Sequence, residues 1–187
     1  MVSQGHYSLF YPSLAPIRKI LVPYFVEGLH RGMACYYFAS QPMIHAMQGW
    51  LHEAGVEAAE ALRSGQFVCS ASLGDPAPRS VDEFLAGMDR LCRTALARYG
   101  AIREAGQCFD ELSGFSPLQV AEAESRVNPL LAAYPITALC CYELSHLSGA
   151  TLLHLLQTHP STIGLDGVKK NPYLRPEAFL ERLHPTN

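Results

Sequence analysis

Six cysteines and eight histidines are the side chains of this chain best suited to bind a metal ion or to act as nucleophiles. No two cysteines have the Cys-x-x-Cys spacing that is typical of zinc sites. Cys140 and Cys141 are adjacent, and successive side chains of a strand point to opposite faces, so their sulfurs are not expected to act together. We therefore predict reduced, mostly buried thiols and no metal site. The alternative at this pair is a redox- or metal-responsive thiol, which would require a lowered thiol pKa.

The remaining titratable residues form no recognisable catalytic set. His45 and His52 are seven residues apart and share one face of a predicted helix; a solvated surface is expected there, with a metal site as the alternative. His159 follows a predicted helix, where a histidine can bond the last carbonyls. Glu122 and Glu124 are two residues apart and point to different sides of a helix, so paired-carboxylate catalysis is not indicated. We assign no catalytic residue.

The segment after the first predicted strand is unsuited to a nucleotide phosphate. Residues 11–18 read Tyr-Pro-Ser-Leu-Ala-Pro-Ile-Arg and contain no glycine, whereas a phosphate loop is rich in glycine. The two prolines also remove backbone donors that would bind phosphate oxygens. We expect no ATP or GTP binding of this type, and we assign no cofactor.

The elements that must position these residues alternate between apolar runs and amphipathic segments. Strands are predicted at 6–11, 33–39, 66–70, 101–105 and 136–142. Helices are predicted at 16–31, 41–54, 56–63, 80–99, 117–134 (interrupted near Pro129), 148–158 and 176–183, and a hairpin at 161–170. The alternation predicts one α/β domain over 1–187, with a mainly parallel sheet, helices on both faces and a C-terminal β-hairpin.

The amino-acid composition and the net charge argue against some classes of binding partner. Of the 187 residues, 49% are hydrophobic and 17% are charged, as expected for a globular domain with a sizeable core. The net charge of −3 argues against direct binding of nucleic acid or an anionic membrane. No run of 18 apolar residues occurs, and the first residues do not resemble a signal peptide. We expect a cytoplasmic protein.

A ligand site is expected where the predicted strands end, because open parallel sheets bind ligands beyond the carboxyl ends of their strands. The expected lining is aromatic, thiol and amide: Tyr11, Gln41, Gln107, Cys141 and Tyr142. Tyr142 is the expected anchor, since its ring supplies apolar area and its hydroxyl supplies orientation. Glu143 and Glu124 are expected to add polar contacts. Such a lining suits a small, weakly polar ligand; the alternative is that these aromatic side chains only close the core.

Six segments, in order and across nearly the whole chain, together resemble a known family. They are HYSLFY (6–11), LVPYFVEGLHRGMACYYFA (21–39), ESRVN (124–128), PITALCCY (135–142), SGATLLHLLQTHP (148–160) and NPYLRPEAFL (171–180). The chain resembles the MEDS domain, the methanogen/methylotroph DcmR sensory domain. The resemblance implies a cytoplasmic sensory module of prokaryotic signalling, proposed to recognise simple hydrocarbon derivatives. Part of the second segment is also similar to KaiC- and RecA-like ATPases, which implies a RecA-like layer without its phosphate loop.

The chain departs from the family pattern at two places. The family often has an acidic residue where Gln107 stands, and a Cys-x-Tyr-Asp sequence where this chain has Cys140, Cys141, Tyr142 and Glu143. Any role that needs a carboxylate at position 107 is therefore in doubt.

Three functions stay open from the sequence. The first is a non-enzymatic ligand sensor that signals through a separate partner, a histidine kinase or a transcription regulator. The second is an enzyme that uses Cys141, Tyr142 or Glu143, and the third is a ligand-free protein-interaction scaffold. Whether the chain forms a homodimer is also open.

Overall fold

The computed structural model describes residues 3–107 and 114–184, which form one α/β domain around a seven-stranded sheet. The strand order is β3-β2-β4-β5-β1-β6-β7. All neighbouring strands are parallel except β6 and β7, which form the predicted C-terminal hairpin. The strands are β1 (Gly5–Tyr11), β2 (Ala34–Phe38), β3 (Phe67–Ser70), β4 (Ile102–Gln107), β5 (Ile136–Glu143), β6 (Ser161–Gly164) and β7 (Gly167–Lys170). The predicted fold class is confirmed.

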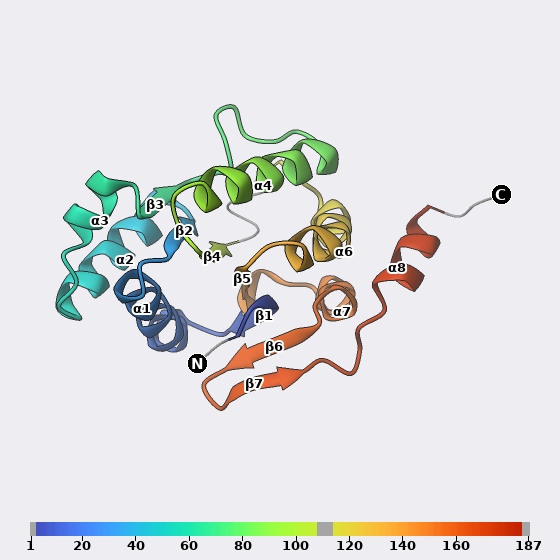
Figure 1. Cartoon of the computed structure of the whole chain (residues 1–187). Coiled ribbons are helices and arrows are strands. Elements are labelled where there is room, and N and C mark those ends of the chain that lie inside the picture. Colours follow the sequence, from blue (N-terminus) through green and yellow to red (C-terminus); the bar gives the residue numbers. More distant parts are fainter. Residues whose placement is uncertain (1–2, 108–113, 185–187) are drawn as a thin grey trace.

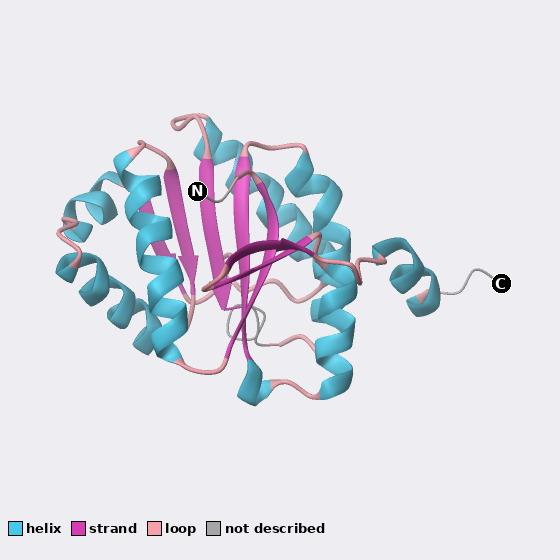
Figure 2. Cartoon of the chain, turned by 90° about the horizontal axis from the view of Figure 1, so that it is seen from below, coloured by secondary structure: helices cyan, strands magenta, loops and turns pink. Residues whose placement is uncertain are grey.

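Helices cover both faces of the sheet (Figures 1 and 2). One face, called the α1 face below, packs against α1 (Leu14–His30), α2 (Gln41–Glu53) and α3 (Ala58–Ser64). The opposite α6 face packs against α4 (Val81–Leu96), α6 (Pro117–Ala132), α7 (Gly149–Thr158) and α8 (Pro176–Leu183). A short 3-10 helix, η1 (Leu144–His146), follows β5. No helix in the described ranges is both long and apolar enough to cross a membrane.

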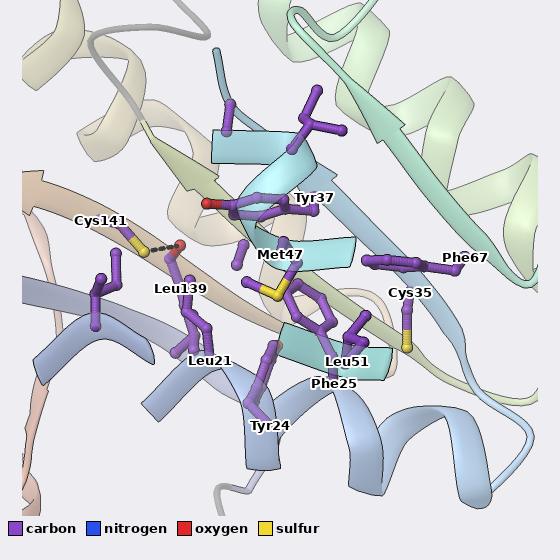
Figure 3. Close-up of a cluster of buried hydrophobic side chains, with 14 of the residues drawn as sticks. Leu21, Tyr24, Phe25, Cys35, Tyr37, Met47, Leu51, Phe67, Leu139 and Cys141 are labelled. Carbon is purple, nitrogen blue, oxygen red and sulfur yellow. Dashed lines mark hydrogen bonds between the residues drawn. The ribbon is translucent and has the colours of Figure 1, made fainter. Parts of the chain in front are cut away.

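Two separate apolar cores result from this layering, and alternation along each strand assigns side chains to one or the other. The α1-face core includes Phe25, Tyr37, Leu139 and Cys141, which Figure 3 shows packed between the sheet and α1 and α2. On the same strand β5, the intervening residues Cys140 and Tyr142 belong to the α6-face core.

The central strand β4 is fully buried although its sequence includes Arg103 and Glu104. The guanidinium of Arg103 pairs with Glu27 at 2.8 Å and lies over the ring of Tyr24, with its carbon 4.8 Å from the ring centroid. Burial of such a charge is tolerated because it is paired and hydrogen-bonded. These partners come from α1, so the sequence of β4 taken alone gives only weak evidence for a buried strand.

The expected interruption of α6 near Pro129 is wrong, because the helix continues to Ala132 with the proline inside it. Proline lacks the N–H that would bond the carbonyl four residues earlier, that of Ser125. The side-chain amide of Asn128 replaces this donor: its Nδ2 lies 3.2 Å from the oxygen of Ser125 and 2.9 Å from that of Glu124.

The predicted start of α4 is confirmed. The hydroxyl of Ser80 accepts a hydrogen bond of 3.2 Å from the backbone N–H of Glu83. The carboxylate of Glu83 accepts in return from the backbone N–H of Arg79, at 2.8 Å. The reciprocal bond therefore reaches one residue further back than in the usual capping box.

Candidate functional site

A small cavity lies at the carboxyl ends of β1, β4 and β5, on the α1 face of the sheet. Its volume is about 210 Å³, and it is lined by Tyr11, Leu14, Ser40, Met43, Gln107, Cys141, Glu143 and His146. We call it the carboxyl-end cavity. Its lining residues come from the ends of three strands, the starts of α1 and α2, and η1. Six separate elements thus meet around one small space.

The polar lining of the carboxyl-end cavity is held by a short chain of hydrogen bonds. The hydroxyl of Tyr11 donates to Oε1 of Gln107 at 2.6 Å, and Nε2 of Gln107 donates to the hydroxyl of Tyr37 at 3.2 Å. Burial raises the pKa of Tyr37, and the nearby Cys141 adds to the shift, so this phenol stays protonated. The amide of Gln107 is therefore fixed in one orientation between two phenols.

The structure brings four of the predicted site residues together and separates the other three. Tyr11, Gln107, Cys141 and Glu143 line the carboxyl-end cavity. Gln41 begins α2 directly after the lining residue Ser40, but it is exposed and is not part of the lining. The expectation of one shared site therefore holds only in part.

Tyr142, the expected anchor, lies on the opposite face of the sheet together with Glu124. Because β5 alternates, Cys141 faces α1 while Tyr142 faces α6, where its hydroxyl donates to Oε1 of Glu124. Neither residue lines the carboxyl-end cavity. The placement of Tyr142 and Glu124 in a common cavity with Tyr11 and Gln107 is corrected accordingly.

The side chains around Glu124 form a compact buried group, which we call the polar cluster: His6, Glu124, Cys140 and His159. Nε2 of His6 lies 3.1 Å from Oε2 of Glu124 and 3.1 Å from Sγ of Cys140. The Cys140 sulfur is 3.3 Å from the same carboxylate oxygen. Nε2 of His159 approaches that oxygen at 3.4 Å. One carboxylate oxygen thus lies within reach of three other polar groups.

Four segments that are distant in sequence supply the polar cluster. His6 is the second residue of β1, Cys140 is central in β5, Glu124 lies inside α6, and His159 caps the end of α7. The first three are 5%, 8% and 3% exposed, and His159 is fully buried. In the parallel β1–β5 pair, Ser8 is opposite Cys140, so His6 and Cys140 share the α6 face.

The electrostatics of the polar cluster favour an ionised carboxylate and a neutral His159. Burial alone would raise the pKa of Glu124, but the facing His159 and His6 hold it well below its ordinary value. Burial is the main cause that lowers the pKa of His159, and the neighbouring His6 adds to this shift. The carboxylate therefore stays negative, while the ring of His159 resists protonation.

The cysteines elsewhere have the inert character that was predicted from the sequence. Burial raises the pKa of the Cys35, Cys69 and Cys92 thiols to about 12. These thiols are free and protonated at neutral pH. Cys108 lies outside the described residues. The expected contact of His159 with the end of its helix is also present, since its Nδ1 lies 3.0 Å from the oxygen of Leu155.

Local sequence spacing does not indicate the polar cluster, because its four residues lie far apart in the sequence. In the sequence, His6 lies at the start of a predicted strand and His159 follows a predicted helix. One signal was available: His6 and Ser8 are polar residues on the same face of a buried strand. Such a polar stripe requires polar partners from the covering helices.

A larger groove of about 820 Å³ lies on the α6 face, between β2, β3 and α4. The segment before α4 borders it, and its lining includes Tyr36, Phe38, Leu73, Pro76 and Arg90. It shares no residue with the carboxyl-end cavity or the polar cluster. None of the predicted site residues lies in it.

Comparison with known proteins identifies the family. No curated protein matches the chain. Among solved structures, the fold is similar to that of the uncharacterized protein PH0321 from Pyrococcus horikoshii, which was determined in complex with an unknown peptide. The TM-score is 0.60 and the sequence identity is 15%, and the match covers 90% of this chain and 83% of that one. At this identity the likeness shows the fold alone. Residues 5–160 match the profile of the MEthanogen/methylotroph, DcmR Sensory domain, and the chain therefore belongs to the MEDS family of sensory domains.

Proposed function

We propose that this chain senses a small, weakly polar organic molecule, which binds in the carboxyl-end cavity and alters contacts with a separate output protein. Membership of a sensory family supports the regulatory part of this proposal. The observation that carries the ligand part is the cavity itself, built from Tyr11, Gln107 and Cys141 at the ends of three buried strands. Cavities at this end of a parallel sheet are the usual place for ligands.

The size and lining of the cavity favour a small ligand. A volume of about 210 Å³ is below the usual range for drug-sized ligands and holds about seven waters at about 30 Å³ each. Apolar contacts would come from Leu14 and Met43, and a single polar group of the ligand could bond the amide of Gln107 or the hydroxyl of Tyr11. A simple alcohol, aldehyde, amine or halogenated hydrocarbon has this chemistry.

The position of the cavity suits transmission of a signal. The starts of α1 and α2 contribute Leu14 and Ser40, and η1 contributes His146. A ligand that contacts all three elements would bind one arrangement of them better than others, and this difference in affinity is what shifts a conformational equilibrium. The output partner we propose is a histidine kinase or a transcription regulator.

The geometry favours binding over catalysis by Cys141, Tyr142 and Glu143. Tyr142 faces α6 while Cys141 and Glu143 face the carboxyl-end cavity, so the three groups do not converge on one substrate. A catalytic set must place its groups within hydrogen-bond reach of one reacting centre. The third reading, a scaffold without a ligand, predicts that no small molecule binds in the carboxyl-end cavity.

A binding screen with a matched pair of variants tests the proposal. The full chain is titrated with simple alcohols, aldehydes, amines and halogenated alkanes while its melting temperature and amide NMR shifts are followed. We expect at least one compound to saturate, with shifts centred on Tyr11, Gln107 and Cys141. Tyr11→Phe should weaken this binding, whereas Tyr142→Phe, on the other face, should not. Saturating shifts centred on the groove beside α4 would contradict the assignment of the site.

A further inference from the structure

We propose that His6, Glu124, Cys140 and His159 bind one divalent transition-metal ion, with zinc as the ion that best matches these four donors. This site is separate from the carboxyl-end cavity, because it lies on the opposite face of β5. Two imidazole nitrogens, a sulfur and a carboxylate oxygen are the donors that zinc takes in proteins. The spacing rule that argued against zinc applies to ligands close in sequence, not to ligands gathered by the fold.

The distances around Glu124 Oε2 are close to those of a tetrahedral shell. Four potential ligand atoms, one from each residue, lie within 4.8 Å of one another. Metal–ligand distances of about 2.0–2.3 Å place neighbouring donors about 3.3–3.8 Å apart in a tetrahedron. The pairs that meet at Glu124 Oε2 are separated by 3.1 Å to His6, 3.3 Å to Cys140 and 3.4 Å to His159. The widest separation among the four donor atoms, up to 4.8 Å, would have to shorten by about 1 Å to complete the shell.

The outer hydrogen bonds fix which nitrogen of His6 faces the cluster. The amide of Asn128 donates through Nδ2 to three carbonyls, those of Glu124, Ser125 and Thr158, so its Oδ1 must be the atom that faces His6. This oxygen can only accept, and it lies 3.0 Å from Nδ1 of His6. The Nδ1 atom therefore carries the proton, and in the neutral ring Nε2 presents its lone pair to the cluster.

The same reasoning holds for His159. Its Nδ1 lies 3.0 Å from the carbonyl oxygen of Leu155, which can only accept. The proton of the neutral ring is thus on Nδ1, and Nε2 presents a lone pair to Glu124. This Nε2 is fully buried and makes no hydrogen bond in the described structure. A buried, unpartnered nitrogen that points at a carboxylate is an arrangement that a cation would satisfy.

In the polar cluster, two imidazole nitrogens, a sulfur and a carboxylate oxygen face one another, and Nε2 of His159 has no hydrogen-bond partner in the described structure. A single metal ion would bind all four groups at once. The bonds from Asn128 to His6 and from Leu155 to His159 are of the kind that orient metal-bound histidines, and Tyr142 holds the second oxygen of Glu124.

The burial of the cluster indicates a closed, structural site. All four ligands come from the chain, which leaves no open position of the kind that catalytic zinc keeps for water. The ion would connect β1, β5, α6 and the end of α7. Metal binding at such a site adds to folding stability, because the unfolded chain has no preformed site.

Cobalt substitution tests the proposal on the full chain. Metal is removed with a chelator, and the protein is titrated with Co²⁺ and with Zn²⁺. We expect one equivalent of Co²⁺ to produce a thiolate-to-cobalt charge-transfer band and the strong visible bands of tetrahedral cobalt. Zinc should displace cobalt and raise the melting temperature. Cys140→Ser should remove the charge-transfer band, while the matched control Cys141→Ser, its neighbour on the other face, should retain it.

The wild-type titration decides the proposal even where a variant fails to fold. A metal-free wild-type protein that stays folded by circular dichroism, but shows neither tetrahedral cobalt bands nor a zinc-dependent melting temperature, would overturn it. A charge-transfer band that persists in folded Cys140→Ser would also overturn it. His159→Gln should weaken cobalt binding at least tenfold, and His154→Gln on the same helix should leave it unchanged.

Discussion

Cys140 and Cys141 are adjacent in β5, but their sulfurs lie on opposite faces of the sheet. Sγ of Cys140 is 3.1 Å from Nε2 of His6 in the polar cluster. Sγ of Cys141 is 3.5 Å from the carbonyl oxygen of Leu139, within the α1-face core (Figure 3). One strand therefore contributes a residue to each of the two candidate sites.

Removing the hydroxyl of Tyr11 should weaken ligand binding. Tyr11→Phe deletes the donor that fixes Gln107, which leaves the amide free to turn within the carboxyl-end cavity. We expect a loss of about 1–3 kcal/mol in binding free energy for a ligand that bonds this amide. Calorimetric titration with a compound identified in the screen measures it. Equal affinities of wild type and Tyr11→Phe, with Tyr142→Phe weakened, would place the ligand on the α6 face.

The two functions of Asn128 should be separable. Asn128→Ala removes both the acceptor for His6 and the donor that replaces the missing N–H of Pro129. It should lower cobalt affinity about 10–100-fold and also lower the free energy of unfolding by about 1–3 kcal/mol. Asn128→Asp keeps an acceptor and should lose stability with a smaller loss of cobalt affinity. Cobalt affinities that are equal for the two variants would refute the orienting role.

The pair of the buried Arg103 and the partly exposed Glu27 should give the protein an acid-dependent stability. The hydrogen bond from Arg103 lowers the pKa of Glu27 in the folded chain. Its contribution is fully present above the unfolded pKa of about 4.3 and is lost as the pH falls through the lower folded pKa. Glu27→Gln should therefore destabilise the protein at pH 7, by an amount that shrinks in acid.

Urea unfolding across this pH range measures the effect of Glu27→Gln. The matched control is Glu60→Gln, since the Glu60–Arg63 pair is exposed and surface pairs contribute little. A destabilisation by Glu27→Gln that is the same at pH 7 and in acid would contradict the account.

Nucleotides should not bind at the start of α1. Only Pro12 and Ser13 connect β1 to α1, which leaves no glycine-rich loop to surround a phosphate. Millimolar Mg-ATP should leave the melting temperature unchanged. A rise of several degrees that Arg18→Ala abolishes would show that this segment binds the nucleotide.

The fold could be predicted from local patterns, whereas the sites depend on register and on distant contacts. Apolar runs and caps such as Ser80 located the strands and helices, because each signal lies within a few residues. The burial of Arg103 in β4 could not be predicted in this way, since the partners of Arg103 come from α1. The side of the sheet reached by Tyr142 follows from strand register, which a one-residue shift reverses.

The polar cluster shows most clearly what local sequence patterns cannot predict. His6 and His159 are separated by nearly the whole chain, and their nearness follows from the parallel pairing of β1 with β6, which begins just after His159. The apolar pattern of a single segment contains no information on such pairings. The polar stripe of His6 and Ser8 on a buried strand was the one local indication.

The central claim is that the carboxyl-end cavity holds a small organic ligand, and mass spectrometry of molecules released from the purified chain tests it most directly. The chain is incubated with a cell extract, washed, denatured and extracted, in parallel with Tyr11→Phe. We predict one small organic molecule, recovered at close to one per wild-type chain and depleted in Tyr11→Phe. Recovery of no small molecule from the wild type, or of the same amount from both proteins, would contradict the claim.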